Sequence, residues 1–235
     1  MLKNAVSVVL ASFRSSTYPK RVRLRSSLAA ALLNGLFEHP AGVSCNSPCS
    51  QGPTMNMKRT NRPHVGLDSQ CLSYLLDAIA GISEPTGLLA AEKKALLHSW
   101  FYKPGTFVLT ETVIAEVSRI RNTNRREFHE SFIRTLFLEY PVRDLATVQA
   151  RAEQFEVSHP NPGDCRILAE AEELRLDFLL TYDHKFWERL SSVSSTTRLL
   201  KPWDFWISRG IPKGAKPVTV PHPTNPLSVQ SWWRW

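Results

Sequence analysis

Four acidic residues lie in segments where their carboxylates could form one chemical site. They are Asp68 in HVGLDSQCLSYLL, Glu116 in LTETVIAEVSRI, Asp164 in NPGDCRILAEAEEL and Asp183 in DFLLTYDHKF. Carboxylate oxygens are the ligands that the hard cations Mg²⁺ and Mn²⁺ prefer. Two such ions about 3.5–4 Å apart can hold the attacking and leaving oxygens during phosphodiester hydrolysis. Because four clustered carboxylates repel one another without cations, the set predicts a cation-dependent site.

Two of these acids, Asp68 and Asp183, come after short apolar segments at residues 65–67 and 178–181 that are typical of buried strands. Ligands of open α/β sheets bind at the carboxyl ends of the strands. An Asp before a helix can also be its N-cap, which explains either residue alone equally well. Two strand ends that both carry an Asp favour a shared site.

The third acid, Glu116, has a competitor, Glu111, on the same expected helix. At about 100° per residue, Glu116 lies at the edge of the apolar stripe beside Ile120, and Glu111 lies on the opposite face. We therefore expect Glu116 to border the sheet and Glu111 to face solvent. The alternative for Glu116 is a surface ion pair with Arg119 or Arg121.

The fourth acid, Asp164, begins an expected helix after Pro162-Gly163, on the face that carries Ile167 and Leu168. Helix capping alone would explain an Asp at this position. Capping and metal binding are compatible, however, and the shared face points toward the core. Asp164 therefore stays in the candidate set.

The elements that would position these acids alternate along the chain. Strands are expected at residues 65–67, 106–110, 178–181 and 199–200 and from Pro141-Val142, and helices at about 72–79, 88–101, from Glu111, 125–138, 145–157, 164–176 and from His184. Such alternation predicts an α/β fold, a three-layer α/β/α sandwich around a mostly parallel central sheet.

Three regions differ in pattern: residues 1–60, a low-order basic extension; residues 61–207, which hold the regular elements; and residues 208–235, an irregular Pro- and Trp-rich tail. For the extension, three explanations compete: an over-extended start with the protein beginning near Met57, a disordered basic arm, and a targeting peptide. We favour the first, because MKRTNRPHVGLD resembles a natural opening before a first strand.

The net charge of +8 is divided unevenly: residues 1–60 carry +7, residues 61–190 carry −4 and residues 191–235 carry +5. The basic ends could attract nucleic acid at long range, but the high isoelectric point is weak evidence that the core binds nucleic acid.

The four cysteines do not form a disulfide framework, and Cys45 and Cys49 lack the partners of a zinc site. Without an apolar run of about 18 residues, we expect a cytoplasmic chain with no membrane partner.

Taken together, these segments resemble the PIN-domain ribonucleases, most of all the bacterial toxin-type members, over roughly residues 64–200. The most specific match is GDCRILAEAEELRLDFLLTYDHKF, in which an Asp opens a small-residue helix and Thr-x-Asp closes the following strand. Residues 82–105 are longer than compact toxins suggest, and the tail after Ser208 has no counterpart. The departures concern substrate and partner more than chemistry.

The resemblance implies that Asp68, Glu116, Asp164 and Asp183 bind Mg²⁺ or Mn²⁺ and are catalytic, with Thr181 and Ser69 in support. It implies endonucleolytic hydrolysis of RNA by a metal-activated water, with an antitoxin protein and a second copy of the chain as partners.

Four arginines and a group of tryptophans outside the acidic set could also contact a substrate. Arg119, Arg121, Arg125 and Arg126 could hold RNA phosphates, although a solvated helix end explains them equally well. For the five tryptophans among the last 33 residues, packing is favoured over base stacking.

A catalytically silent RNA- or protein-binding module is the main alternative function. A haloacid-dehalogenase-type phosphatase is weaker, because Gln70 stands where it needs a second Asp.

Overall fold

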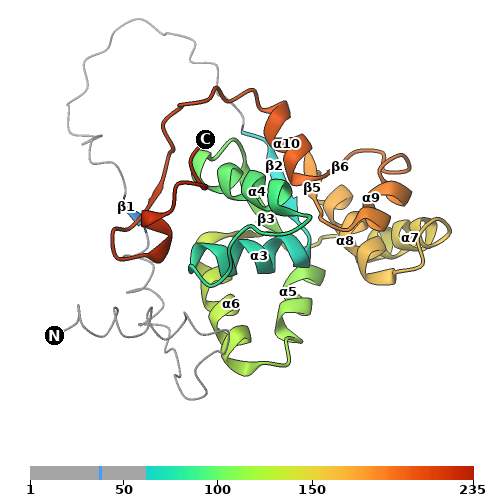
Figure 1. Ribbon diagram of the computed structural model, residues 1–235. Coiled ribbons are helices and arrows are strands. Elements are labelled where there is room, and N and C mark those ends of the chain that lie inside the picture. The colour runs from blue at the N-terminus through green and yellow to red at the C-terminus, as the bar shows by residue number, and fades with distance from the viewer. Residues whose placement is uncertain (1–36, 39–61) are drawn as a thin grey trace, which may run out of the picture.

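Five short parallel strands form the central sheet of the computed structural model, which describes residues 37–38 and 62–235 (Figure 1). The order across the sheet is β4-β3-β2-β5-β6. The strands are β2 (His64–Leu67), β3 (Thr106–Leu109), β4 (Leu138–Glu139), β5 (Phe178–Leu180) and β6 (Arg198–Leu200). All four neighbouring pairs are parallel, which confirms the predicted α/β class.

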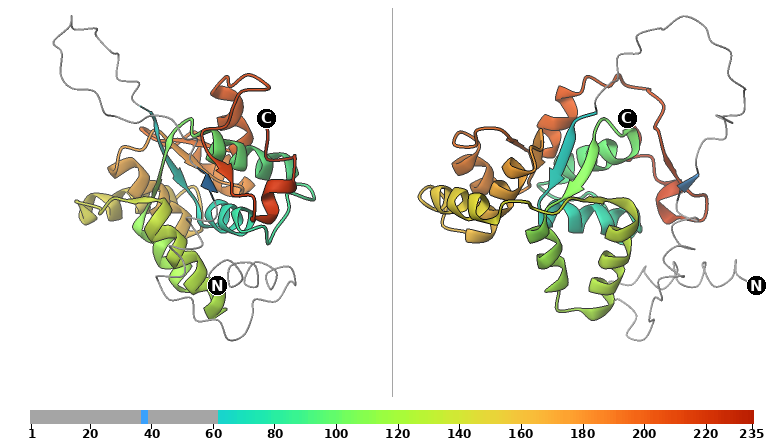
Figure 2. Two further views of the ribbon diagram at one scale, coloured as in Figure 1. Left: turned by 90° about the vertical axis from the view of Figure 1, so that its left-hand side faces the viewer. Right: turned by 180° about the vertical axis from the view of Figure 1, so that it is seen from behind.

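Eight helices in the described part of the chain flank this sheet (Figure 2). They are α3 (Ser69–Ile79), α4 (Ala90–Tyr102), α5 (Glu111–Ser118), α6 (Thr123–Leu136), α7 (Leu145–Glu156), α8 (Pro162–Glu173), α9 (His184–Leu190) and α10 (Pro202–Ser208). Every connection between successive strands of the sheet contains at least one helix, as parallel pairing requires. Among the described residues, no helix is long and apolar enough to cross a bilayer.

The order of the strands places a topological switch point between β2 and β5. From β2 the chain moves outward through β3 to β4, then returns to the other side of β2 as β5 and continues to β6. In open α/β sheets, ligands bind beyond the carboxyl ends of the strands at such a point. The residues that follow Leu67 and Leu180 are therefore the first place to look for a site.

Two element boundaries differ from the prediction for identifiable reasons. The strand expected from Pro141-Val142 is wrong: β4 ends at Glu139, and the Val142 N–H instead donates to the Glu111 side chain at 3.0 Å. Helix α8 begins at Pro162, because proline suits the first turn of a helix, and the Asn161 side chain accepts from Gly163 N. The proposed N-cap role of Asp164 is therefore wrong.

Helix α10 was not predicted, and together with the tail it covers α4. Trp233 is only 2% exposed and packs on Phe101, with ring centroids 4.8 Å apart. The main chain at Val218 and Thr219 donates two hydrogen bonds to the Phe101 carbonyl. A strand, β7 (Val220–Pro221), and a 3₁₀ helix, η1 (Pro226–Val229), are the regular elements of the tail, and β7 pairs antiparallel with β1 (Phe37–Glu38). The tail is thus built into the core.

The remaining predictions for residues 1–60, including the alternative start, Cys45 and Cys49, lie outside the described residues. Cys71 and Cys165 are free and lie buried in the hydrophobic core.

Replacing Trp233 with alanine tests the role of the tail in the core. Because the side chain is almost fully buried, we expect Trp233→Ala to lower the free energy of unfolding by roughly 3–5 kcal/mol in urea titrations. Trp203→Ala is the matched control, because Trp203 is 38% exposed and should cost less. Equal stability of Trp233→Ala and the wild type would show that the tail does not stabilise the domain.

Candidate functional site

Asp68 and Thr181 meet at the carboxyl ends of two neighbouring strands. The register pairs Leu67 with Leu180, so Asp68 and Thr181, the residues that follow these strands, lie at the same end of the sheet. The Thr181 hydroxyl donates to Asp68 Oδ2, and Asp68 N donates to the Leu180 carbonyl at 3.0 Å. Asp68 Oδ1 also accepts from Cys71 N at 2.6 Å, which caps α3. Asp68 is therefore both an N-cap and a buried carboxylate at the switch point.

Burial makes the charge of Asp68 unfavourable. Asp68 is 5% exposed, and this burial raises the pKa of its carboxyl from 3.8 to about 6. Hydrogen bonds from Thr181 and Cys71 act in the opposite direction, and the nearby charge of Asp164 raises the pKa further. At neutral pH the site therefore holds a desolvated negative charge that a cation would stabilise.

Asp183 is joined to Asp68 through the same threonine. Asp183 N donates to Thr181 Oγ1 at 2.9 Å, so one hydroxyl links the two acidic segments. The Asp183 side chain caps α9: Oδ1 accepts from the backbone N–H groups of Lys185 and Phe186. Both bonds go to Oδ1, which leaves Oδ2 for another ligand.

Glu116 approaches the same region from α5. It is half-buried, as expected, whereas Glu111 is exposed. Ser69, the neighbour of Asp68, donates its hydroxyl to Glu116 Oε2. The other oxygen lies 3.1 Å from the position that a Cβ on Gly163 would occupy, against the first turn of α8. Glu116 thus lies between the N-termini of two helices, whose positive ends favour its charge.

His159 is a residue of the site that sequence reasoning missed. Its Nε2 lies 2.7 Å from Asp164 Oδ2, and its ring stacks on Phe186 with centroids 5.9 Å apart. The imidazole is buried, and Nδ1 has no hydrogen-bond partner among the described residues. His159 therefore fixes the direction in which the Asp164 carboxylate points. The signal was the short spacing HPNPGD, in which two prolines restrict the loop between the pair.

Glu170, a second missed residue, ties α5 to α8. Thr110 is the N-cap of α5, but its hydroxyl makes no capping bond and has no partner among the described residues. The fully buried Glu170 instead accepts from Thr112 N at 2.9 Å and from the Thr112 hydroxyl at 2.6 Å, and it pairs with Arg166 at 3.2 Å. This contact holds the helix of Glu116 against the helix of Asp164.

Asp68, Glu116, Asp164 and Asp183, together called the acidic cluster, offer oxygen ligands of the kind that Mg²⁺ and Mn²⁺ take. Within residues 62–235, however, no three Asp, Glu, His or Cys side chains are placed so that they could hold one metal ion together. Direct binding would need side-chain rotation or bridging waters, and Mg²⁺ normally keeps several waters. The carboxylate oxygens are therefore suitable ligands for a cation, but their side chains must rotate or bind through water before they can hold one ion together.

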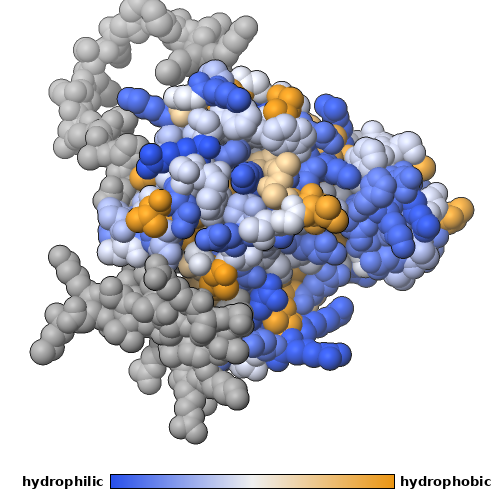
Figure 3. Space-filling view, viewed as in Figure 1, coloured by the Kyte–Doolittle hydropathy of each residue, from blue (hydrophilic) through white to orange (hydrophobic). Residues whose placement is uncertain are grey.

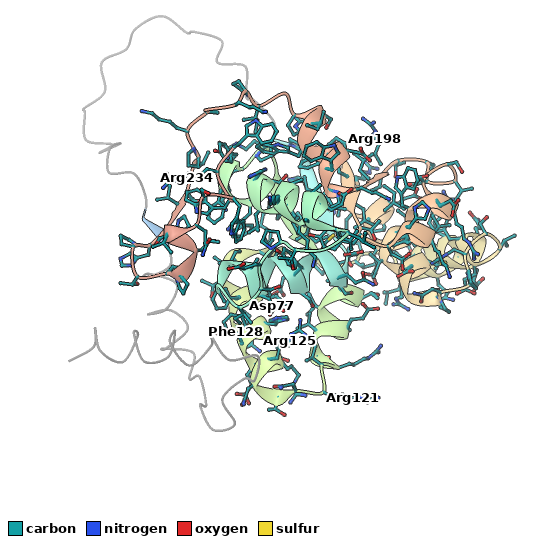
Figure 4. All side chains as sticks on the ribbon, in the orientation of Figure 1. Asp77, Arg121, Arg125, Phe128, Arg198 and Arg234 are labelled. Atoms are coloured by element: carbon teal, nitrogen blue, oxygen red, sulfur yellow. The ribbon has the colours of Figure 1, made fainter. Side chains whose placement is uncertain are left out.

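The four arginines proposed to contact RNA have different environments. Arg125 forms an ion pair with Asp77 at 2.7 Å, and Arg126 donates to the Ile120 carbonyl at 3.1 Å. Arg119 and Arg121 are exposed. Figure 4 shows Arg125 beside Asp77 and Arg121 at the outer end of the α5–α6 hairpin. Arg125 is therefore paired with Asp77 rather than solvated at a helix end, and contact with RNA stays a prediction for all four arginines.

No protein-family model matches this chain, and a search of curated proteins found no match. Thr181 contacts the Asp68 side chain and the Asp183 backbone, Ser69 contacts Glu116, and Glu116 lies against Gly163, the residue before Asp164.

The raised pKa of Asp68 predicts a pH-dependent stability in cation-free buffer. Its contribution is fully present below about pH 4 and is lost as pH rises through about 6, because the folded state then buries a charge. Asp68→Asn removes the titration while keeping hydrogen-bonding atoms for Thr181 and Cys71. We expect the variant to gain up to roughly 3 kcal/mol over the wild type between pH 4 and pH 8 in urea titrations. A stability difference that does not change with pH would contradict this account.

Proposed function

We propose that this chain is a PIN-like ribonuclease that hydrolyses RNA phosphodiester bonds with Mg²⁺ or Mn²⁺ at the acidic cluster. The observation that carries the proposal is the buried Asp68 carboxylate, whose pKa is raised by burial and by Asp164 at the topological switch point of the sheet. Such a charge is costly without a cation, and perturbed carboxylates in a cluster are typical of functional sites. We also propose that the helices on the two faces of the sheet make the three-layer α/β/α arrangement of that family.

The roles of the side chains follow from their contacts. Asp68, Asp164 and Asp183 would hold the ion directly or through water, and Glu116 would complete the ligand shell. Thr181 positions Asp68 and Asp183, Ser69 positions Glu116, and His159 positions Asp164. A bound cation supplies Lewis acidity, which neutralises phosphate charge and makes water a better nucleophile at neutral pH. The toxin-type resemblance adds an antitoxin protein and a second copy of the chain as proposed partners, and the cytoplasm as the proposed location.

A non-catalytic RNA- or protein-binding module is the alternative. One observation favours it: among the described side chains, no three acidic, His or Cys groups are arranged around a common ion position. Against it, capping of α3 does not require a charge, yet Asp68 is a buried carboxylate whose charge, near that of Asp164, a cation would stabilise.

Cleavage of a labelled RNA pool with and without Mn²⁺ distinguishes the two functions. Asp183→Asn is the informative variant, because Asn keeps the cap of α9 while removing a charged ligand. We expect Mn²⁺-dependent cleavage by the wild type and a loss of roughly 10- to 100-fold or more in the variant.

The matched control is Asp177→Asn. Asp177 precedes β5, at the amino ends of the strands and so opposite the acidic cluster. It accepts from His64 N, a hydrogen bond that Asn can keep. This variant should cleave at the wild-type rate. RNA binding without cleavage by all three proteins would support the binding module and contradict the nuclease.

A further inference from the structure

A group of aromatic and basic side chains lies at the same edge of the sheet as the acidic cluster. The register pairs Leu180 with Leu200, so Lys201 follows β6 at the edge where Thr181 follows β5. His184 is the residue directly after Asp183. The chain thus carries two further side chains to the border of the proposed active site.

These side chains contact one another around Trp187. The His184 and Trp187 rings stack with centroids 5.9 Å apart and an interplanar angle of 21°. Lys201 Nζ lies 5.2 Å from the centroid of the Trp187 ring and 3.5 Å from His184 Nδ1. The side chain of His184 is 63% exposed, so a further ring can stack on it. We call His184, Trp187 and Lys201 the stacking platform.

We propose that the stacking platform binds one nucleotide of single-stranded RNA beside the acidic cluster. A base would stack on the exposed His184 ring and extend the Trp187–His184 stack, while Lys201 meets the adjacent phosphate. Aromatic faces and a nearby cation are the features that bind single strands with little sequence preference, because every base has a π-face. This inference rests on the proposed function, for which it supplies the substrate class and one binding subsite.

The charge near the platform is consistent with a local contact for phosphate. Lys201 is the N-cap residue of α10 by its backbone position, and its ammonium, which has only donors, takes no part in capping. Glu188 lies 3.9 Å from His184, and Glu92, which Lys201 faces, accepts from Trp203 N at 2.7 Å. These acids repel a phosphate, and Lys201, whose charge acts on Glu92, is the basic side chain of the platform that can offset this repulsion.

An apolar partner surface is a weaker explanation for this region. On the face seen in Figure 3, hydrophobic residues form small separate patches among hydrophilic ones. A ring pair with a charged rim suits a polar, stackable ligand better than an apolar protein surface.

Binding of a fluorescein-labelled 12-nucleotide oligouridylate, followed by anisotropy in EDTA, tests the platform. EDTA prevents cation-dependent cleavage, so the measurement does not require activity. We expect His184→Ala to weaken binding by roughly 5-fold or more, as the loss of one stacking partner predicts. Lys201→Ala should weaken binding and reduce the slope of log K against log salt by about 0.7, the value for one phosphate contact on a single strand.

Lys216→Ala is the matched control, because it removes one exposed positive charge from the tail between α10 and β7 instead, at a residue with no proposed role in binding. We expect its affinity and salt slope to equal those of the wild type. His184 and Lys201 are surface side chains, and thermal melting of each variant checks that the fold is intact. Wild-type affinity and slope in both platform variants would overturn the proposal, as would an equal loss in Lys216→Ala.

The same variants separate this inference from the proposed nuclease. If the platform variants bind RNA normally and the wild type cleaves RNA with Mn²⁺, the platform is wrong and the nuclease stands. If the platform variants lose binding and no protein cleaves, the platform stands and the nuclease is wrong.

Discussion

Burial of one carboxylate, that of Asp68, is the constraint on which the proposed site depends. Parallel pairing of β2 with β5 places this residue beside Thr181 at the switch point of the sheet. Hydrogen bonds from the Thr181 hydroxyl and from Cys71 N do not offset the loss of water, and the pKa stays near 6. The buried charge of Asp68 is unfavourable in a domain that binds no cation. A bound cation would stabilise it, because the cation supplies the missing counter-charge.

The surrounding contacts keep the other acids near this charge. Glu170 binds the first turn of α5, so the helix that carries Glu116 is fixed against α8. His159 directs Asp164. Buried polar contacts of this kind are costly to leave half-satisfied, and they therefore determine one arrangement of the helices rather than several. The site is consequently built on strand ends and helix starts, which move less than free loops.

Sequence reasoning could locate the parts of the site that depend on local pattern. Apolar strands followed by an acid identified Asp68 and Asp183, and helical periodicity separated Glu116 from Glu111, because both signals lie within a few residues. The contacts that it missed connect distant segments: Glu170 reaches Thr112 across 58 residues, and Arg125 reaches Asp77 across 48. The cap of α8 was misassigned because Asn161 and Asp164 are both good capping residues, and only the position of Pro162 in the first turn decides between them.

The central claim is that the acidic cluster binds a divalent cation, and the most direct test is calorimetric titration of Mn²⁺ into the full chain at pH 8. The account predicts saturable binding by the wild type that Asp68→Asn weakens by at least the roughly 10- to 100-fold cost of losing a supporting residue in a metal site. Asp177→Asn, at the opposite edge of the sheet, should bind as the wild type does. Weak, non-saturable binding that is the same in all three proteins would contradict it.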